Sequence, residues 1–164
     1  MGIADYCKNR KGLENILVIG PDRRGASLEG SKDHAKAFMT ACRIPTALYR
    51  TFSCGQYAEA CLYLDSLEPP YVLKADGLAA GKGVLVEPNL DKARAGLKEM
   101  MEGKFGAAGN KVVVEQFLRG TEVSVFILTD GIHYKVLPEA KDYKRIGEHD
   151  QGPNTGGMMF LIQT

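Results

Sequence analysis

Tyr71-Val-Leu-Lys-Ala-Asp-Gly-Leu-Ala-Ala-Gly-Lys-Gly-Val-Leu-Val86 is the stretch that decides the fold of this chain. Val72 and Leu73 are apolar and suit a buried strand, and Val84–Val86 restart the apolar pattern after a glycine-rich interval. Short apolar runs separated by glycine turns are typical of paired strands. The stretch therefore predicts a strand, a turn and a second strand.

The turn carries three glycines within seven residues, Gly77, Gly81 and Gly83. Glycine has no Cβ, so a loop of this kind can direct backbone N–H groups toward an anion. Lys74 adds a positive charge at the end of the incoming strand, and Lys82 adds another at the tip. Two lysines and an open amide loop suit a polyphosphate such as that of ATP.

This loop differs from the common mononucleotide-binding loop, which has four residues before its Gly-Lys pair and then Ser or Thr. Three residues separate Gly77 from Gly81, and Gly83 follows Lys82, so the hydroxyl that would bind magnesium is missing. A flexible hairpin with solvated lysines is the alternative interpretation. The loop alone leaves both interpretations open.

Composition restricts the class of protein. The 164 residues suffice for one domain or two small lobes, and 45% hydrophobic with 25% charged residues is typical of a soluble globular chain. A net charge of +1 argues against a general nucleic-acid-binding protein. No apolar run approaches the roughly 20 residues that span a bilayer, and we expect no membrane partner.

The cysteines and histidines indicate neither a disulfide framework nor a metal centre. The four cysteines contain no Cys-x-x-Cys pair, and the three histidines have no ligand-like spacing. No signal peptide is recognisable at Met1–Asp5. We therefore expect a reducing, cytoplasmic location and assign no metal ligand in this sequence.

Mixed helical and strand periodicities favour an α+β fold rather than a doubly wound sheet. The predicted helices cover residues 3–10, 32–42, 56–67 and 90–102, and the second of them has Ser31 as its N-cap and an apolar face of Ala35, Phe38, Met39 and Cys42. Further strands are predicted over residues 16–19, 46–52, 111–118, 121–128 and 133–137. Residues 22–30 are expected to form a linker, and 138–155 a polar loop.

A second informative stretch runs from Val114 to Glu122. A strand that ends here would leave the backbone of Glu115–Leu118 free to read the polar edge of an adenine ring. Phe117 and Leu118 could cover the face of the ring, and Glu122 could accept from ribose hydroxyls. Glutamates beside a turn are also commonly just solvated, so this stretch is weak by itself.

Together the two stretches resemble the ATP-grasp superfamily, which holds ATP between two antiparallel-sheet lobes. Its first lysine precedes a helix, its second lysine ends a strand before a glycine-rich loop, and a Glu-x-x-Leu link with a later Glu reads adenosine. The resemblance implies ATP as cofactor and the following nucleotide-binding residues: Lys32, Lys74, Gly77, Gly81, Lys82, Gly83, Glu115, Phe117, Leu118 and Glu122.

Four segments narrow the resemblance to the phosphoribosylamine–glycine ligase family: Leu28–Lys32, Leu73–Val84, Pro138–Arg145 and Gly152–Met158. The similarity covers roughly residues 16–158. It implies that ATP phosphorylates the carboxylate of glycine, and that the amine of 5-phosphoribosylamine then displaces phosphate to give glycinamide ribonucleotide in purine biosynthesis. The partners implied are these small molecules.

The same resemblance implies residue roles near the carboxy-terminal end. Lys144 and Arg145 are the catalytic candidates, because cations stabilise the charge that gathers on a transferred phosphoryl group. The residues expected to face the substrates are Asp142, Asn154, Thr155 and Gly156. Without the resemblance, this region would be interpreted as a solvated loop.

The sequence also departs from the family pattern, and we expect it to be a fragment. Residues 1–30 are similar to the tail of an amino-terminal domain, 31–122 to the nucleotide-binding lobe and 123–164 to the start of the catalytic core. The match breaks at Met159, before the segment in which the family binds Mg²⁺. We therefore expect weak or no ATP binding and no turnover by this chain alone, and exposed apolar strands that favour self-association.

Two other interpretations stay open. Another ATP-grasp ligase could join a different carboxylate and amine, although residues 138–145 and 152–158 favour the glycine ligase. A non-catalytic nucleotide-binding module is the second alternative, and the early break in the match favours it for this chain. Glycine-dependent ADP formation, assayed after the missing segments are restored, would distinguish an enzyme from a module.

Overall fold

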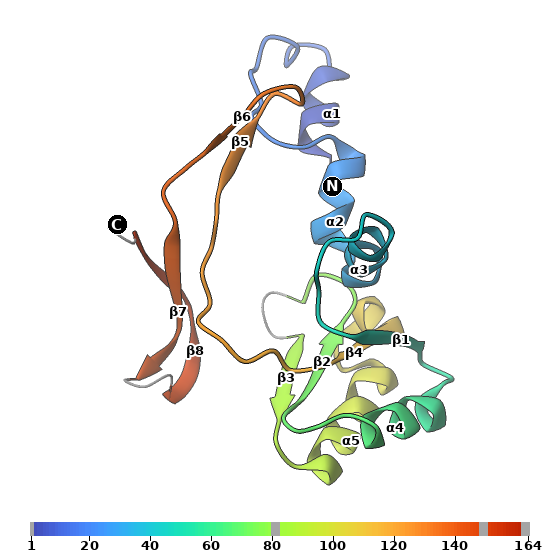
Figure 1. Cartoon of the computed structure of the whole chain (residues 1–164). Helices are drawn as coiled ribbons and strands as arrows, with labels where there is room; N and C mark the ends of the chain where they lie inside the picture. Colours follow the sequence, from blue (N-terminus) through green and yellow to red (C-terminus); the bar gives the residue numbers. More distant parts are fainter. Residues whose placement is uncertain (1, 80–82, 148–150, 162–164) are drawn as a thin grey trace. The chain divides into compact units, whose positions relative to one another are not determined.

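A computed structural model describes residues 2–79, 83–147 and 151–161, with the backbone alone for residues 107, 142–146 and 151–161. The chain divides into two compact units, residues 1–118 and 119–164, and each is described by itself. The first unit combines helices with a sheet and the second contains strands, so the α+β prediction is confirmed. Figure 1 shows the elements along the chain.

The first unit contains five α-helices and four strands within its described residues. In chain order these are α1 (Ile3–Lys8), α2 (Arg23–Gly30), α3 (Lys32–Ala41), β1 (Tyr49–Ser53), α4 (Tyr57–Asp65), β2 (Tyr71–Ala75), β3 (Val84–Glu87), α5 (Leu90–Glu99) and β4 (Lys111–Glu115). A π-helical turn (Met100–Lys104) and a 3₁₀ turn (Gly106–Asn110) join α5 to β4.

The four strands form one antiparallel sheet in the order β1-β4-β2-β3. β2 and β3 pair as a hairpin with Lys74 opposite Val84, which confirms the strand–turn–strand prediction. β2 also pairs with β4, where Val72 lies opposite Glu115. The two strands that carry Lys74 and Glu115 are therefore neighbours in the middle of the sheet.

Helices α4 and α5 lie against one face of this sheet (Figure 1). The core beneath them consists of alternate strand residues and the inward helix positions, chiefly Phe52, Ala60, Leu64, Leu73, Ala93, Leu97, Val112 and Val114. Side chains alternate between the faces of a strand, so Lys74, next to Leu73, and Glu115, next to Val114, project from the opposite face. The hydrophobic core thus fixes which face carries the charged residues.

Two expectations for the amino-terminal segment are wrong. Residues 16–19 form no strand, and Leu17 and Ile19 are 86% and 79% exposed. Four apolar residues predict a strand only if a neighbour pairs with them, and no described strand does so. The expected linker at 22–30 is instead helix α2, whose N-cap Asp22 accepts a hydrogen bond of 2.8 Å from the amide of Gly25.

The second unit consists of two antiparallel strand pairs, β5 (Ile127–Thr129) with β6 (Tyr134–Val136), and β7 (Ala140–Gly147) with β8 (Gln151–Leu161). Asp130 holds the turn between β5 and β6, because its carboxylate accepts from the amides of His133 (2.6 Å) and Ile132 (2.9 Å). These hydrogen bonds lower the pKa of Asp130 to about 2.

The polar loop expected over residues 138–155 is wrong, because β7 and the first part of β8 occupy its described residues from Ala140 onward. Strand pairing satisfies backbone N–H and C=O groups whatever the polarity of the side chains, so a polar sequence can still form a ladder. The strand predicted over residues 121–128 is shorter than expected and is regular only from Ile127.

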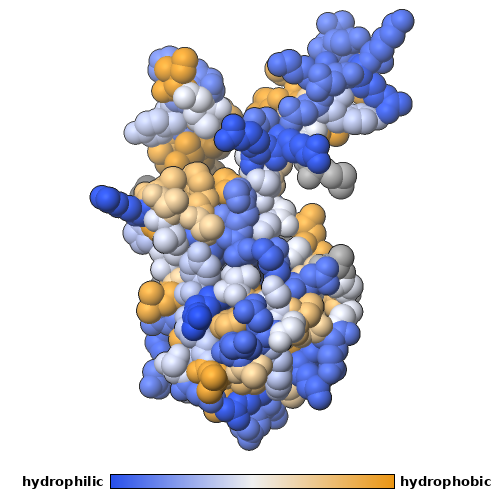
Figure 2. All heavy atoms as spheres, turned by 90° about the vertical axis from the view of Figure 1, so that its right-hand side faces the viewer, coloured by the Kyte–Doolittle hydropathy of each residue, from blue (hydrophilic) through white to orange (hydrophobic). Residues whose placement is uncertain are grey.

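Large hydrophobic side chains remain exposed in both units. In the second unit, Ile132 is 85% and Tyr134 is 74% exposed, and in the first, Leu48 and Leu62 are 68% and 70% exposed. Figure 2 shows one face of the molecule, on which hydrophobic residues reach the surface between hydrophilic ones. Within the described residues, no helix combines the length and the apolar character that crossing a membrane requires.

Candidate functional site

Lys74 and Glu115 form an ion pair on the sheet face that α4 and α5 do not cover. The Lys74 side chain is 31% exposed, whereas that of Glu115 is 5% exposed. Lys74 lies opposite Val113 in the register and thus diagonal to Glu115, a separation that long side chains bridge readily. The carboxylate is therefore buried behind an ammonium group that reaches the surface.

A second lysine pairs with the same carboxylate. Lys36 of α3 is 8% exposed and forms an ion pair with the other carboxylate oxygen of Glu115. Its ammonium also donates to the hydroxyl of Thr46 (2.8 Å) and the carbonyl of Ala47 (3.3 Å), and it lies 5.3 Å from the centre of the Tyr49 ring. A buried lysine needs such partners, because an unpaired buried charge is costly.

Sequence reasoning missed Lys36. The predicted helix is confirmed as α3, with Ser31 as its N-cap, but the predicted apolar face is wrong, because Phe38 is 43% exposed and Cys42 is exposed. The polar partners of Lys36 come from residues that the helical periodicity cannot reveal. The available signal was a lysine placed between two alanines, Ala35 and Ala37, in the middle of the helix.

Lys32, the first residue of α3, lies against the beginning of the glycine-rich loop. Its ammonium donates to the backbone carbonyls of Gly77 (3.1 Å) and Asp76 (3.4 Å), and its amide donates to Asp76 as well (3.3 Å). An ammonium has three donors, so these two contacts leave one for a further acceptor. The structure thus brings Lys32 to the same loop that follows Lys74.

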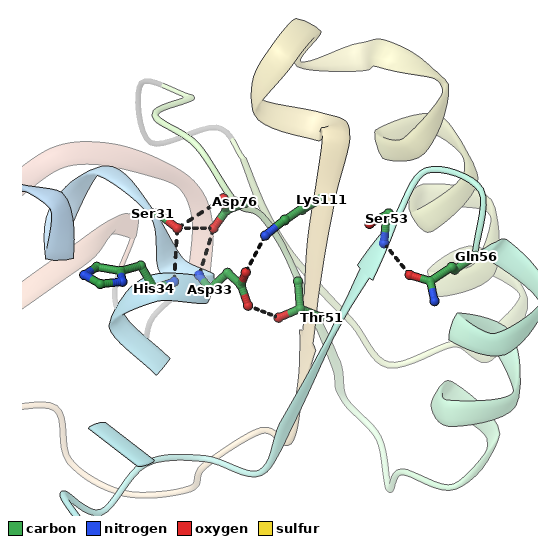
Figure 3. A network of polar contacts seen from close by, with 8 residues as sticks. All are labelled: Ser31, Asp33, His34, Thr51, Ser53, Gln56, Asp76 and Lys111. Atoms are coloured by element: carbon green, nitrogen blue, oxygen red, sulfur yellow. Dashed lines mark hydrogen bonds and ion pairs between the residues drawn. The ribbon is translucent and has the colours of Figure 1, made fainter. Parts of the chain in front are cut away.

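The carboxylate of Asp76 joins this loop to the start of α3 (Figure 3). It accepts from the hydroxyl of Ser31 at 3.0 and 3.2 Å and from the amide of Asp33 at 2.8 Å. The Ser31 hydroxyl in turn accepts from the amide of His34 at 3.0 Å. An acidic group near a helix N-terminus is favourable because it satisfies free amides and the helix dipole.

Asp33 extends the network to two strands. Its carboxylate accepts from Lys111 of β4 at 2.6 Å and from the Thr51 hydroxyl of β1 at 2.7 Å (Figure 3). The hydrogen bond from Lys111 is the main reason that the pKa of Asp33 lies below its usual value, and it raises the pKa of Lys111. The network therefore anchors α3, with Lys32 and Lys36, to the sheet.

The glycines of the loop fit closely against their neighbours. A Cβ at Gly77 would lie 2.9 Å from the Cβ of Ala108, and one at Gly83 would lie 2.7 Å from the Cβ of Ala79. The Gly77 amide donates to the Ala108 carbonyl at 3.3 Å, so this N–H is already occupied by the protein. Gly81 and Lys82 lie outside the described residues.

The predicted adenine link follows β4. The amide of Gln116 donates to the carbonyl of Leu48 at 2.8 Å, Phe117 is half-buried and Leu118 is 63% exposed. These residues end the first unit, whereas Glu122 is exposed and belongs to the second. The structure thus brings Glu115 together with Lys74, and places Phe117 and Leu118 just beyond it along the chain.

The predicted substrate residues lie on the strand pair of the second unit. Asp142, Lys144 and Arg145 are in β7, and Asn154, Thr155 and Gly156 are in β8. The backbone register sets Arg145 opposite Asn154. Over the part of the chain whose side chains are described, no three His, Cys, Asp or Glu side chains gather as a metal ion would require.

Comparison with known proteins identifies the family of this chain. Residues 30–162 match the family model described as phosphoribosylglycinamide synthetase, ATP-grasp (A) domain. The chain belongs to this family. The phosphoribosylglycinamide synthetase match spans most of the first unit and nearly all of the second, including each of the candidate residues above.

Curated relatives carry the name phosphoribosylamine–glycine ligase. One from Leptospira interrogans (serovar copenhageni) is 53% identical over 158 residues, which is 96% of this chain and 36% of the relative. Another from Mesorhizobium japonicum is 50% identical over 157 residues, again 96% of this chain and 36% of the relative. The chain therefore spans little more than a third of the length of the relatives that it matches.

Solved structures agree with the family's fold. The phosphoribosylamine–glycine ligase of Thermotoga maritima is 36% identical, with a TM-score of 0.80 over 90% of this chain and 38% of that one. The VanG D-Ala:D-Ser ligase of Enterococcus faecalis has a TM-score of 0.66 at 20% identity, over 91% of this chain and 42% of that one. The second likeness concerns the fold alone.

Proposed function

We propose that this chain is the nucleotide-binding part of an ATP-dependent ligase that joins glycine to 5-phosphoribosylamine. One observation carries the proposal: Lys74, partly exposed at the end of β2, projects beside the buried Glu115 where the glycine-rich loop begins. Curated relatives about 50% identical, which bear the ligase's name, support the choice of substrates. The fold likeness to D-Ala ligases does not favour their substrates.

In the proposed reaction, a carboxylate oxygen of glycine attacks the γ-phosphorus of ATP, and ADP leaves. The amine of phosphoribosylamine then attacks the acyl carbon, loses a proton and releases phosphate. Lys74 and Lys32 would bind the phosphates, because fixed cations stabilise the negative charge that gathers during phosphoryl transfer. The third donor of the Lys32 ammonium is suited to that contact.

The proposal gives the other predicted residues their roles. Phe117 and Leu118 would cover the adenine, with the backbone from Glu115 reading its edge, and Glu122 would bind the ribose. Lys144 and Arg145 would act on the transferred phosphoryl group, while Gly81, Lys82 and Gly83 would line the phosphates. The substrate-facing residues would be Asp142, Asn154, Thr155 and Gly156.

Magnesium remains a prediction for the family, with ligands expected beyond Met158, since the described side chains offer no cluster that would hold the ion. We also propose a cytoplasmic location. It is supported by the four cysteines, Cys7, Cys42, Cys54 and Cys61, all of which are free thiols.

A chimera tests the proposal. Replacing the matched 158 residues of the Leptospira interrogans relative with this chain should give glycine-dependent release of ADP in the presence of phosphoribosylamine. Lys74→Met in the chimera should abolish most of this release, whereas Lys98→Met, at an exposed position of α5, should leave it unchanged. A folded chimera that hydrolyses ATP regardless of glycine, or a fully active Lys74→Met variant, would contradict the proposal.

A further inference from the structure

We infer that Lys36 is a positioning residue for nucleotide phosphates: its charge satisfies Glu115, so that the ammonium of Lys74 stays available to an anion. This inference rests on the proposed function, because it assigns ATP to the same site. It adds a residue that does not itself reach the ligand.

The cluster of Lys36, Lys74 and Glu115 carries a surplus positive charge. Lys36 and Lys74 contribute two positive charges and Glu115 contributes one negative charge, so the three side chains carry a net charge of +1. The two lysines pair with different oxygens of the one carboxylate. Glu115 therefore has a partner even when Lys74 turns toward another anion.

The three side chains differ in their exposure to solvent. The side chains of Lys36 and Glu115 are 10% and 5% exposed, whereas that of Lys74 is 31% exposed. The surplus charge can thus reach a ligand only through Lys74. An anion that binds Lys74 neutralises the net positive charge of the cluster. Charge interactions are stronger at such partly buried positions than in water.

Lys36 is held in a fixed position. Its ammonium donates to Thr46 and Ala47, on the segment that leads into β1, and α3 is anchored to β4 through the ion pair of Asp33 with Lys111. These contacts hold the ammonium beside Glu115 rather than leaving it free to approach the ligand. Lys36 therefore acts through Glu115 and Lys74.

Removing the Lys36 charge should change the cluster from +1 to neutral. Glu115 would then have Lys74 as its one ion-pair partner among the described residues, and a phosphate would have to compete with a buried carboxylate for that ammonium. The affinity for ATP should fall about tenfold. The affinity for adenosine, which has no phosphate, should stay unchanged.

The test is an NMR titration of the 164-residue chain with ATP and with adenosine at concentrations up to the millimolar range, following the amides of Ala75 and Val114. Lys36→Met and Lys36→Gln should each lose about tenfold in ATP affinity, and Lys36→Arg should lie within about threefold of wild type. Lys98→Met, which removes an exposed lysine of α5, serves as the matched control.

The double variant Lys36→Met with Glu115→Gln separates the proposed role from a structural one. It removes the buried carboxylate together with the lysine, so Lys74 again has no competitor and ATP affinity should return to within about threefold of wild type. The amide spectrum of every variant reports its folding. If neither single variant folds, the double variant decides: a folded double variant whose affinity for ATP is more than about tenfold below that of wild type overturns the inference.

The remaining outcomes distinguish the two proposals. If the wild-type chain alone shows no ATP-dependent shifts, the same titration and variants are carried out in the chimera described above, and a chimera that binds no ATP overturns the nucleotide site and this inference together. Wild type that binds ATP, with Lys36→Met binding equally well, overturns the inference alone. Equal losses for ATP and adenosine indicate a structural role of Lys36 and also overturn it.

Discussion

The carboxylate of Asp76, just after β2, accepts a hydrogen bond of 3.0 Å from the hydroxyl of Ser31, 45 residues earlier in the chain. The same carboxylate accepts from the amide of Asp33 at 2.8 Å. One side chain thus fastens the beginning of the glycine-rich loop to the beginning of the helix that carries Lys32 and Lys36 (Figure 3).

Asp76→Ala should therefore destabilise the first unit by about 1–3 kcal/mol, because the Asp33 amide and the Ser31 hydroxyl lose a partly buried acceptor. Asp76→Asn keeps one acceptor oxygen of similar shape and should lose less. Urea unfolding followed by circular dichroism measures both variants. A stability of Asp76→Ala within about 0.5 kcal/mol of wild type would show that the network is not needed.

Gly77→Ala should shift the loop away from the 3₁₀ turn. The new Cβ would lie 2.9 Å from the Cβ and 3.0 Å from the Cα of Ala108. Relieving this clash requires a shift of the backbone, which costs more free energy than the rotation of a flexible side chain. We expect a loss of about 1–3 kcal/mol in stability and altered amide signals at Ala108. Gly55→Ala is the control, since a Cβ at that position would meet no described atom within 4 Å, and its stability should change by less than about 0.5 kcal/mol.

Leu64 and Leu62 of α4 provide a matched pair for testing the core. Leu64 is completely buried and Leu62 is 70% exposed. Leu64→Ala should cost about 2–5 kcal/mol through lost burial and a cavity, whereas Leu62→Ala should stay within about 0.5 kcal/mol of wild type. Similar urea midpoints for the two variants would mean that α4 does not cover the sheet as described.

The ion pair of Asp33 with Lys111 should make stability depend on pH. The pKa of Asp33 is lowered in the folded state, chiefly by the hydrogen bond from Lys111. The contribution of the ionised Asp33 to the free energy of unfolding is therefore complete above the pKa of Asp33 in the unfolded chain, about 3.9. It is lost as the pH falls through the lower pKa of Asp33 in the folded state.

Lys111→Met should accordingly have a lower urea midpoint than wild type at neutral pH, and the difference should shrink below the unfolded pKa of about 3.9. Lys98→Met, whose lysine lies 3.8 Å from Glu102 at an exposed position, controls for the general effect of removing a lysine. A difference between wild type and Lys111→Met that stays constant down to acidic pH would contradict the assignment.

The exposed apolar side chains of the β5–β6 hairpin should favour self-association. Ile127, Ile132, Tyr134 and Val136 are between 52% and 85% exposed, and exposed hydrophobic strands are prone to pair with other chains. Sedimentation velocity should show a weight-average mass that rises with concentration, and Ile132→Lys with Val136→Lys should suppress that rise. A monomer at all concentrations for the unmodified chain would refute this expectation.

The first unit is largely predictable from its sequence, because most of its elements have local signals. The apolar runs on each side of Gly77–Gly83 specify the β2–β3 hairpin, and Ser31 specifies the start of α3. The signals fail where an element depends on distant partners. Ile16–Ile19 has a strand composition without a strand beside it, whereas the polar β7 and β8 become strands by pairing with each other.

The candidate site is predictable only in part for a related reason. Lys74 can be predicted as a site residue from its position just before the glycine-rich loop. Lys36 can be recognised only from its contacts with Glu115, far along the chain, and with Thr46. A lysine in the middle of an amphipathic helix is normally solvated. The strand register that buries Glu115 has to be known before the partner of that lysine can be recognised.

β4 is enclosed by β1 and β2, so each of its edges is paired. Amide protons on such a strand exchange with deuterium mainly when the whole sheet opens, whereas fraying releases those of an outer strand. Glu115 is therefore carried by one of the two inner strands of the sheet, and the carboxylate between the two lysines should keep its position when the outer strands fray.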